Sequence, residues 1–139
     1  MQYAVSRRGV PGPASLGKWC STVSKKMRVT LRIVGAREGR RLNARYRKKP
    51  RPTNVLSFSY GRGEGDIVLC HPVIAREARA QGKRLAAHYA HLVVHGALHL
   101  SGYDHETKAE AARMARAEVR ILARLGLGDP YAVESDARR

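Results

Sequence analysis

The sequence predicts an α+β fold in which one small mixed sheet of about four strands is packed by helices. Two observations lead to this class: the segments with strand-like patterns are short and few, and several longer segments have helical spacing of apolar residues. The chain has 139 residues, of which 43% are hydrophobic, which is enough for one core. We therefore expect a single domain over residues 1–139 and exclude a disordered chain.

Three segments are predicted as strands, and a fourth is expected at the edge of the sheet. Residues 29–34 alternate apolar and polar side chains, while 55–60 and 66–70 are short apolar runs between turn residues. Tyr3 to Val5 is the expected edge strand.

Four helices are predicted from apolar residues at helical spacing. They cover residues 36–47, 72–81, 84–100 and 106–125. The last should end at Gly126, because glycine readily adopts the left-handed conformation that closes a helix.

The charge is strongly basic and unevenly distributed. The chain has 27 Lys and Arg against 11 Asp and Glu, a net charge of +16. Residues 1–52 contain 15 of the basic side chains and one acid, Glu38. A basic surface in this first part favours nucleic acid as the partner, the alternative being a compositional preference for arginine at exposed positions.

Two cysteines and the N-terminal segment bear on the compartment. Cys20 and Cys70 are too few for a disulfide framework, and residues 9–13 are rich in Gly and Pro where an export signal would be apolar. We expect a cytoplasmic protein. Residues 85–103 lack Lys, Arg, Asp and Glu but contain four histidines, which indicates a buried helix carrying a site rather than a membrane span.

The histidines of this helix recur every three or four residues. His88, His91, His95 and His99 therefore lie along one face, and we interpret the first two as core residues. His95 and His99 are one turn apart, and Gly102 can end the helix so that the chain returns His105 toward them. This pattern predicts a three-histidine metal site at the end of the helix, with the open fourth position typical of catalytic zinc.

The same spacing is found in metzincin proteases, where a glutamate after the first histidine is the general base. Gly96 occupies that position here and cannot accept a proton, so a peptidase remains only a weak alternative. A metal-bound water can also cleave a phosphodiester.

Three blocks of the sequence resemble the YbeY family of bacterial endoribonucleases. Residues 95–105 read His-Gly-Ala-Leu-His-Leu-Ser-Gly-Tyr-Asp-His and fit every fixed position of the family signature. Residues 42–58 and 65–70 contain the other two blocks, and the ending at 125–131 is similar as well.

The resemblance implies a metal-dependent RNase that prefers single strands and acts in 16S rRNA 3′-end maturation and ribosome quality control. It implies one Zn²⁺ at His95, His99 and His105, a catalytic role for Arg47, and the small ribosomal subunit with its associated factors as partners, with no membrane. A guanidinium such as that of Arg47 can clamp a phosphate with two hydrogen bonds.

A second class of function stays open on these residues. The chain could be an RNA-binding ribosome-maturation factor whose metal is structural, which would require a fourth protein ligand. His91 is the only nearby candidate in the sequence.

Overall fold

The structure, a computed structural model, describes residues 1–4, 9–47, 53–103 and 106–131, except for the side chains of residues 46 and 47. Its elements, in chain order, are β1 (Gln2–Tyr3), α1 (Pro13–Val23), β2 (Arg28–Val34), α2 (Ala36–Arg47), β3 (Val55–Gly61), β4 (Glu64–Cys70), α3 (His71–Ala80), α4 (Leu85–Leu100) and α5 (Lys108–Arg124).

The four strands form one mixed sheet in the order β1-β2-β4-β3. β1, β2 and β4 are parallel, whereas β3 runs antiparallel to β4 and is an edge strand. The predicted α+β class with one small mixed sheet is therefore confirmed. The edge strand at the N-terminus includes Tyr3, as expected, and pairs Gln2 with Arg32 of β2.

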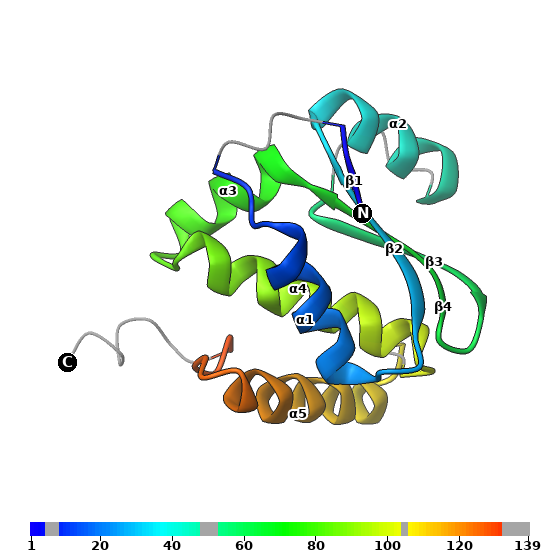
Figure 1. Cartoon of the computed structure of the whole chain (residues 1–139), viewed down its shortest axis with the longest axis vertical. Coiled ribbons are helices and arrows are strands. Elements are labelled where there is room, and N and C mark those ends of the chain that lie inside the picture. The colour runs from blue at the N-terminus through cyan, green and yellow to red at the C-terminus, as the bar shows by residue number, and fades with distance from the viewer. Residues whose placement is uncertain (5–8, 48–52, 104–105, 132–139) are drawn as a thin grey trace.

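The helices cover the two faces of the sheet differently (Figure 1). On one face, the alternating residues Leu31 and Ile33 of β2 pack with Ile67 and Leu69 of β4 against α1 and α4. On the other face, α2 packs Leu42 over a cluster from β2, β3 and β4. Strand alternation thus decides which helix each side chain meets.

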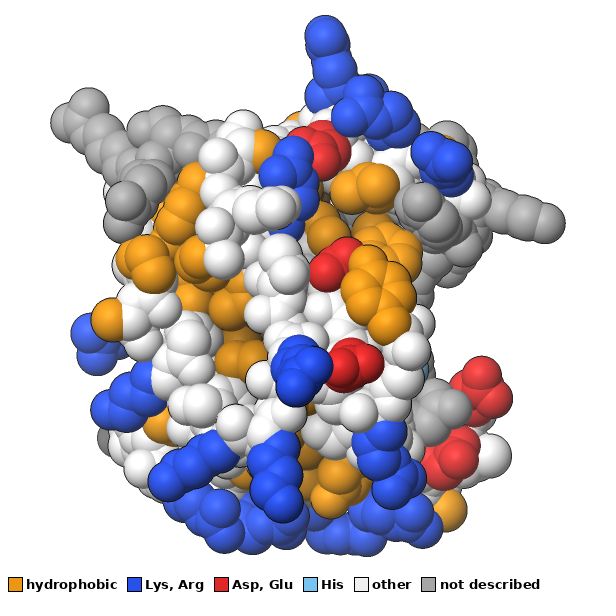
Figure 2. Space-filling model, turned by 45° about the vertical axis from the view of Figure 1, so that its right-hand side comes forward, with side chains coloured by type: hydrophobic (Ala, Val, Ile, Leu, Met, Phe, Trp, Pro, Cys, Tyr) orange, Lys and Arg blue, Asp and Glu red, His pale blue; other side chains and the backbone are white. Residues whose placement is uncertain are grey.

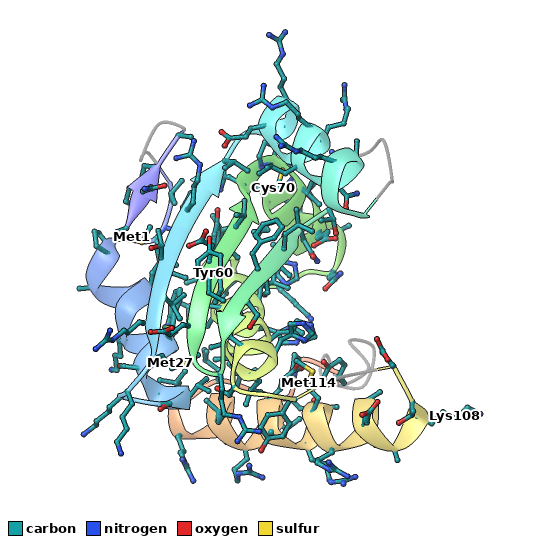
Figure 3. All side chains as sticks on the ribbon, turned by 90° about the vertical axis from the view of Figure 1, so that its right-hand side faces the viewer. Met1, Met27, Tyr60, Cys70, Lys108 and Met114 are labelled. Carbon is teal, nitrogen blue, oxygen red and sulfur yellow. The ribbon has the colours of Figure 1, made fainter. Side chains whose placement is uncertain are left out.

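Helix α4 is the centre of the molecule. Two of its residues, Val93 and Ala97, pack against the sheet and α1, while Val94 and Leu98 pack against α5, where Met114 is labelled in Figure 3. A helix that is buried on several sides needs apolar residues around most of its circumference, which explains the uncharged run in the sequence. No helix in the described part of the chain is long and apolar enough to cross a membrane.

Two glycines end the last two helices as the sequence predicts. Gly102 has φ +111°, and the N–H groups of Gly102 and Tyr103 donate to the carbonyls of His99 and Leu98. Gly126 closes α5 in the same way, with φ +79°. Both follow the pattern in which a left-handed glycine satisfies the last helical carbonyls.

One helix was not among the predicted elements. α1 buries Leu16 and Cys20, with Trp19 and Val23 packed beside them, and Pro13 is its first residue. These apolar residues follow helical spacing, so the signal was present in a segment that also carries glycine and polar residues.

Candidate metal centre

The four histidines of α4 lie in a row from the core to the end of the helix. His88 is buried, and its Nε2 lies 2.9 Å from Oε1 of Glu77. His91 Nε2 lies 2.9 Å from Oε1 of Glu118. His88 is therefore a core residue with an internal partner, as predicted, whereas His91 has an internal partner but is only partly buried.

A single buried carboxylate holds two of these imidazoles. Glu118 of α5 is 0% exposed, and its second oxygen, Oε2, lies 2.5 Å from Nδ1 of His95. The hydroxyl of Tyr131 donates a further hydrogen bond to Oε1. One carboxylate thus connects His91, His95 and Tyr131 across the contact between α4 and α5.

The surroundings keep Glu118 ionised. Burial by itself would raise the pKa of this carboxyl, but the hydrogen bonds from His91, His95 and Tyr131 more than offset it and lower the pKa to about 2. An ionised carboxylate is only an acceptor, so His95 donates through Nδ1–H and its lone pair is on Nε2. Hydrogen bonding of this kind orients metal-binding histidines.

His99 lies one turn beyond His95 on the same helix, shortly before the turn at Gly102. His95 is 28% exposed in its side chain and His99 is half-buried, so both are near the surface at the end of α4. His105, the third predicted ligand, lies outside the described residues. Within the described ranges there is no group of three or more His, Cys, Asp or Glu side chains that could hold a metal.

The donor chemistry of the two described histidines fits zinc. Neutral imidazoles one turn apart are common zinc ligands, and the carboxylate behind His95 supplies the supporting hydrogen bond. Glu118 and Tyr131 were missed by the sequence reasoning. The signal for Glu118 was a charged residue among apolar residues with helical spacing: Met114, Ala117, Ile121 and Leu122.

Comparison with known proteins assigns the family. Residues 16–126 match the family model described as endoribonuclease YbeY. The chain belongs to the YbeY family.

Relatives in this family match over almost the whole chain. An endoribonuclease YbeY from Laribacter hongkongensis is 50% identical over 96% of this chain and 89% of its own length. One from Stenotrophomonas maltophilia is 47% identical over 96% of this chain and 92% of its own length. A protein of Thermotoga maritima with a known solution structure has a TM-score of 0.60 at 26% identity, covering 94% of this chain and 97% of the other.

The packing of α4 leaves little space at position 96, the residue after His95. A Cβ atom on Gly96 would lie 3.0 Å from Oγ of Ser57 and 3.2 Å from two carbons of Ile67. Position 96 therefore faces the sheet at close range and has no room for a carboxylate side chain. This steric limit further disfavours the peptidase alternative.

His91, the candidate for a fourth ligand of a structural metal, has partners inside the protein. Its Nε2 contacts Glu118, and its ring packs edge-on against Tyr131 with centroids 5.3 Å apart. Both interactions direct His91 toward the C-terminal segment. Its Nε2 is therefore engaged by Glu118 and is not directed at a metal beside His95 and His99.

Arg47, the predicted catalytic residue, and Asp66, in another YbeY block, lie on different elements. Arg47 is the last residue of α2, and its side chain lies outside the described residues. Asp66 accepts a hydrogen bond from the hydroxyl of Tyr60 on the neighbouring strand, which gives it a structural partner.

Proposed function

We propose that this chain is a zinc-dependent endoribonuclease that hydrolyses phosphodiester bonds of single-stranded RNA in rRNA processing. Its specific tasks are 16S rRNA 3′-end maturation and ribosome quality control in the cytoplasm, with the small ribosomal subunit and its factors as partners. The whole of residues 1–139 acts as one domain. Membership of the YbeY family supports the reaction class.

The observation that carries the metal assignment is the hydrogen bond from His95 to Glu118. It fixes the tautomer of His95, so that the lone pair of Nε2 is the one that would bind the metal. His99 lies one turn away on the same helix. His95, His99 and His105 would hold one Zn²⁺. Zinc, when bound, lowers the pKa of a coordinated water toward ~7 and polarises a phosphoryl oxygen.

The chain's own residues supply position and charge for this reaction. Glu118 keeps His95 oriented and excludes the wrong tautomer. Arg47 clamps the scissile phosphate, since a guanidinium donates two hydrogen bonds and stabilises charge that grows on the phosphoryl oxygens.

The experiment is zinc analysis combined with single-turnover cleavage of a labelled single-stranded RNA. His99→Ala should lose most of its bound zinc and its cleavage, because it leaves one fewer imidazole in the site. His71→Asn is the matched control. His71 lies on α3, where its Nδ1 is 2.6 Å from the hydroxyl of Tyr89, and asparagine keeps a polar atom there.

Two results would contradict this function. Full zinc content in His99→Ala would remove the metal assignment. Zinc-loaded protein that binds the RNA without cutting it would favour the maturation factor with a structural metal.

A further inference from the structure

The outer face of α5 carries a row of four arginines. Arg113, Arg116, Arg120 and Arg124 are separated by three, four and four residues, so they share one face, and all four are exposed. At 1.5 Å per residue the row extends over about 16 Å. Figure 2 shows Lys and Arg side chains gathered along the lower edge of the molecule, where α5 runs in Figure 1.

A cavity of about 470 Å³ opens beside this row. It lies between the end of α1, the turn that joins β3 to β4, and α5, and its basic side chains are Lys26, Arg62, Arg120 and Arg124. The same cavity has apolar walls from Met27, Leu98 and Ile121, and Tyr103 adds an aromatic ring. Cations at a rim with apolar and aromatic walls suit a nucleotide, because one part is anionic and the other is a flat ring.

These arginines are not neutralised within the described part of the chain. The ion pairs formed there by arginines with carboxylates are Arg28 with Glu64 and Arg32 with Glu38, and neither includes a residue of α5. Like charges four residues apart on a helix repel each other, so Arg116, Arg120 and Arg124 do not stabilise α5. The row therefore has a charge that an external polyanion can balance.

The acids nearest to α5 are engaged elsewhere. Glu118 is buried with its imidazole partners on the inner face. Glu110 accepts from the backbone N–H of Thr107 in the cap of α5, although it also lines a smaller basic cavity with Arg62 and Arg113. The outer face of α5 thus remains cationic from Arg113 to Arg124.

The cavity lies against the end of the helix that carries the site histidines. Leu98 and Ser101 of this helix end line the cavity, as does Tyr103 just beyond it, while His99 lies between Leu98 and Ser101 in sequence. Arg62 reaches across this end, where its guanidinium would lie 3.1 Å from a Cβ on Gly102. The cavity and the two described histidines thus share the C-terminal end of α4 but lie on different sides of that helix.

We propose that the arginine row of α5 and the adjoining cavity bind the backbone of single-stranded RNA beyond the bond that is cut. The row pairs with successive phosphates, and one unpaired base enters the cavity against Tyr103 and Met27. This assignment rests on the proposed endoribonuclease function and adds to it a second contact surface that lengthens the recognised strand.

The test compares two triple variants of the zinc-loaded full chain. Arg116→Gln/Arg120→Gln/Arg124→Gln removes three charges of the row, and Arg76→Gln/Arg79→Gln/Arg84→Gln removes three exposed charges on α3 and at the start of α4. Binding of a tetranucleotide and of a single-stranded RNA of about sixteen nucleotides is measured by fluorescence anisotropy across a salt series. Circular dichroism checks that each variant is folded.

The row variant should bind the longer RNA roughly tenfold more weakly, with a slope of log K against log salt that is smaller by about 2, from 0.7 per phosphate contact. Its affinity for the tetranucleotide should fall by less than its affinity for the longer RNA, because the shorter strand makes fewer phosphate contacts. The α3 variant should keep the slope of the unaltered chain.

An unchanged slope in the row variant would overturn this inference and leave the endoribonuclease function intact. Equal losses in both variants would also overturn it, because the effect would then follow net charge alone. Failure of the unaltered zinc-loaded chain to bind RNA would overturn the endoribonuclease function together with this surface.

Discussion

The two faces of α5 carry charges of opposite sign in opposite surroundings. On the inner face, Glu118 is fully buried and hydrogen-bonded to two imidazoles and a tyrosine. On the outer face, Arg116, Arg120 and Arg124 are exposed and have no carboxylate partner within the described residues. Burial and partners decide what each charge does. The inner charge fixes geometry, whereas the outer charges act on partners in solution and are screened by salt.

The largest effect, on the rate of RNA cleavage, is expected for Arg47, which belongs to α2 and thus to neither face of α5. Arg47→Ala should slow cleavage by about 10²- to 10³-fold, because its proposed partner is charge that develops only in the transition state. RNA affinity should fall by only about 1 kcal/mol, as for one phosphate contact. Single-turnover cleavage and affinity are measured on the same zinc-checked sample.

Arg41→Ala is the control for this change, since Arg41 is an exposed residue of the same helix. Equal losses of rate and affinity in Arg47→Ala would make Arg47 an ordinary phosphate anchor, comparable with the outer-face arginines.

The inner face is tested by removing the charge of Glu118. Glu118→Gln should lower zinc affinity by about 10- to 100-fold, because a neutral amide holds the Nδ1–H of His95 less strongly. Competition with a zinc-binding dye measures this affinity. Glu64→Gln removes an exposed acid that is 3.8 Å from Arg28, and its zinc affinity should not change. Equal zinc affinities in the two variants would show that the buried charge does not prepare the site.

Close packing of α4 against the sheet at Gly96 can be compared with the hydrogen bond between His95 and Glu118. Gly96→Ala should destabilise the fold by about 1 kcal/mol, since crowding against Ser57 and Ile67 exceeds the gain in helix propensity. Gly17→Ala in α1 is the matched control. No atom lies within 4 Å of its added Cβ, so this variant should gain up to about 1 kcal/mol. Urea unfolding measures both, and a gain in stability for Gly96→Ala would refute the close approach.

The smallest effect is expected for the free energy of unfolding when the arginines on the outer face of α5 are replaced. Replacing Arg116, Arg120 and Arg124 with Gln should raise the free energy of unfolding by a few tenths of a kcal/mol at low salt, because like-charge repulsion on α5 is relieved. The difference should disappear at high salt. Urea unfolding at two ionic strengths checks this, and a loss of more than about 1 kcal/mol would mean that the row has internal partners.

Local patterns were sufficient to predict most elements but not the partners of the site. α2 was predicted with its observed bounds, and α4 within one residue, because their spacing and helix ends are encoded in adjacent residues. The partnership of His95 with Glu118 depends on how α5 packs against α4. That packing joins residues 23 positions apart, and spacing within one helix does not report it.

The net charge of each part of the chain did not reveal every basic surface. The sequence predicted a basic surface from residues 1–52, yet the arginine row comes from the nearly balanced second part. The balance is misleading because several acids of that part have partners. Glu77 contacts Asn54 and His88, and Glu118 is buried.

The position of Glu118 in the chain has a consequence for biosynthesis. A polypeptide leaves the ribosome from its N-terminus, so α4 emerges before α5. His95 acquires its carboxylate partner only after Glu118 has followed and α5 has docked, and Tyr131 joins later still. A nascent chain therefore holds His95 without its carboxylate partner until α5 has docked on α4. In this order of assembly, the hydrogen bond that orients His95 is one of the later contacts to form.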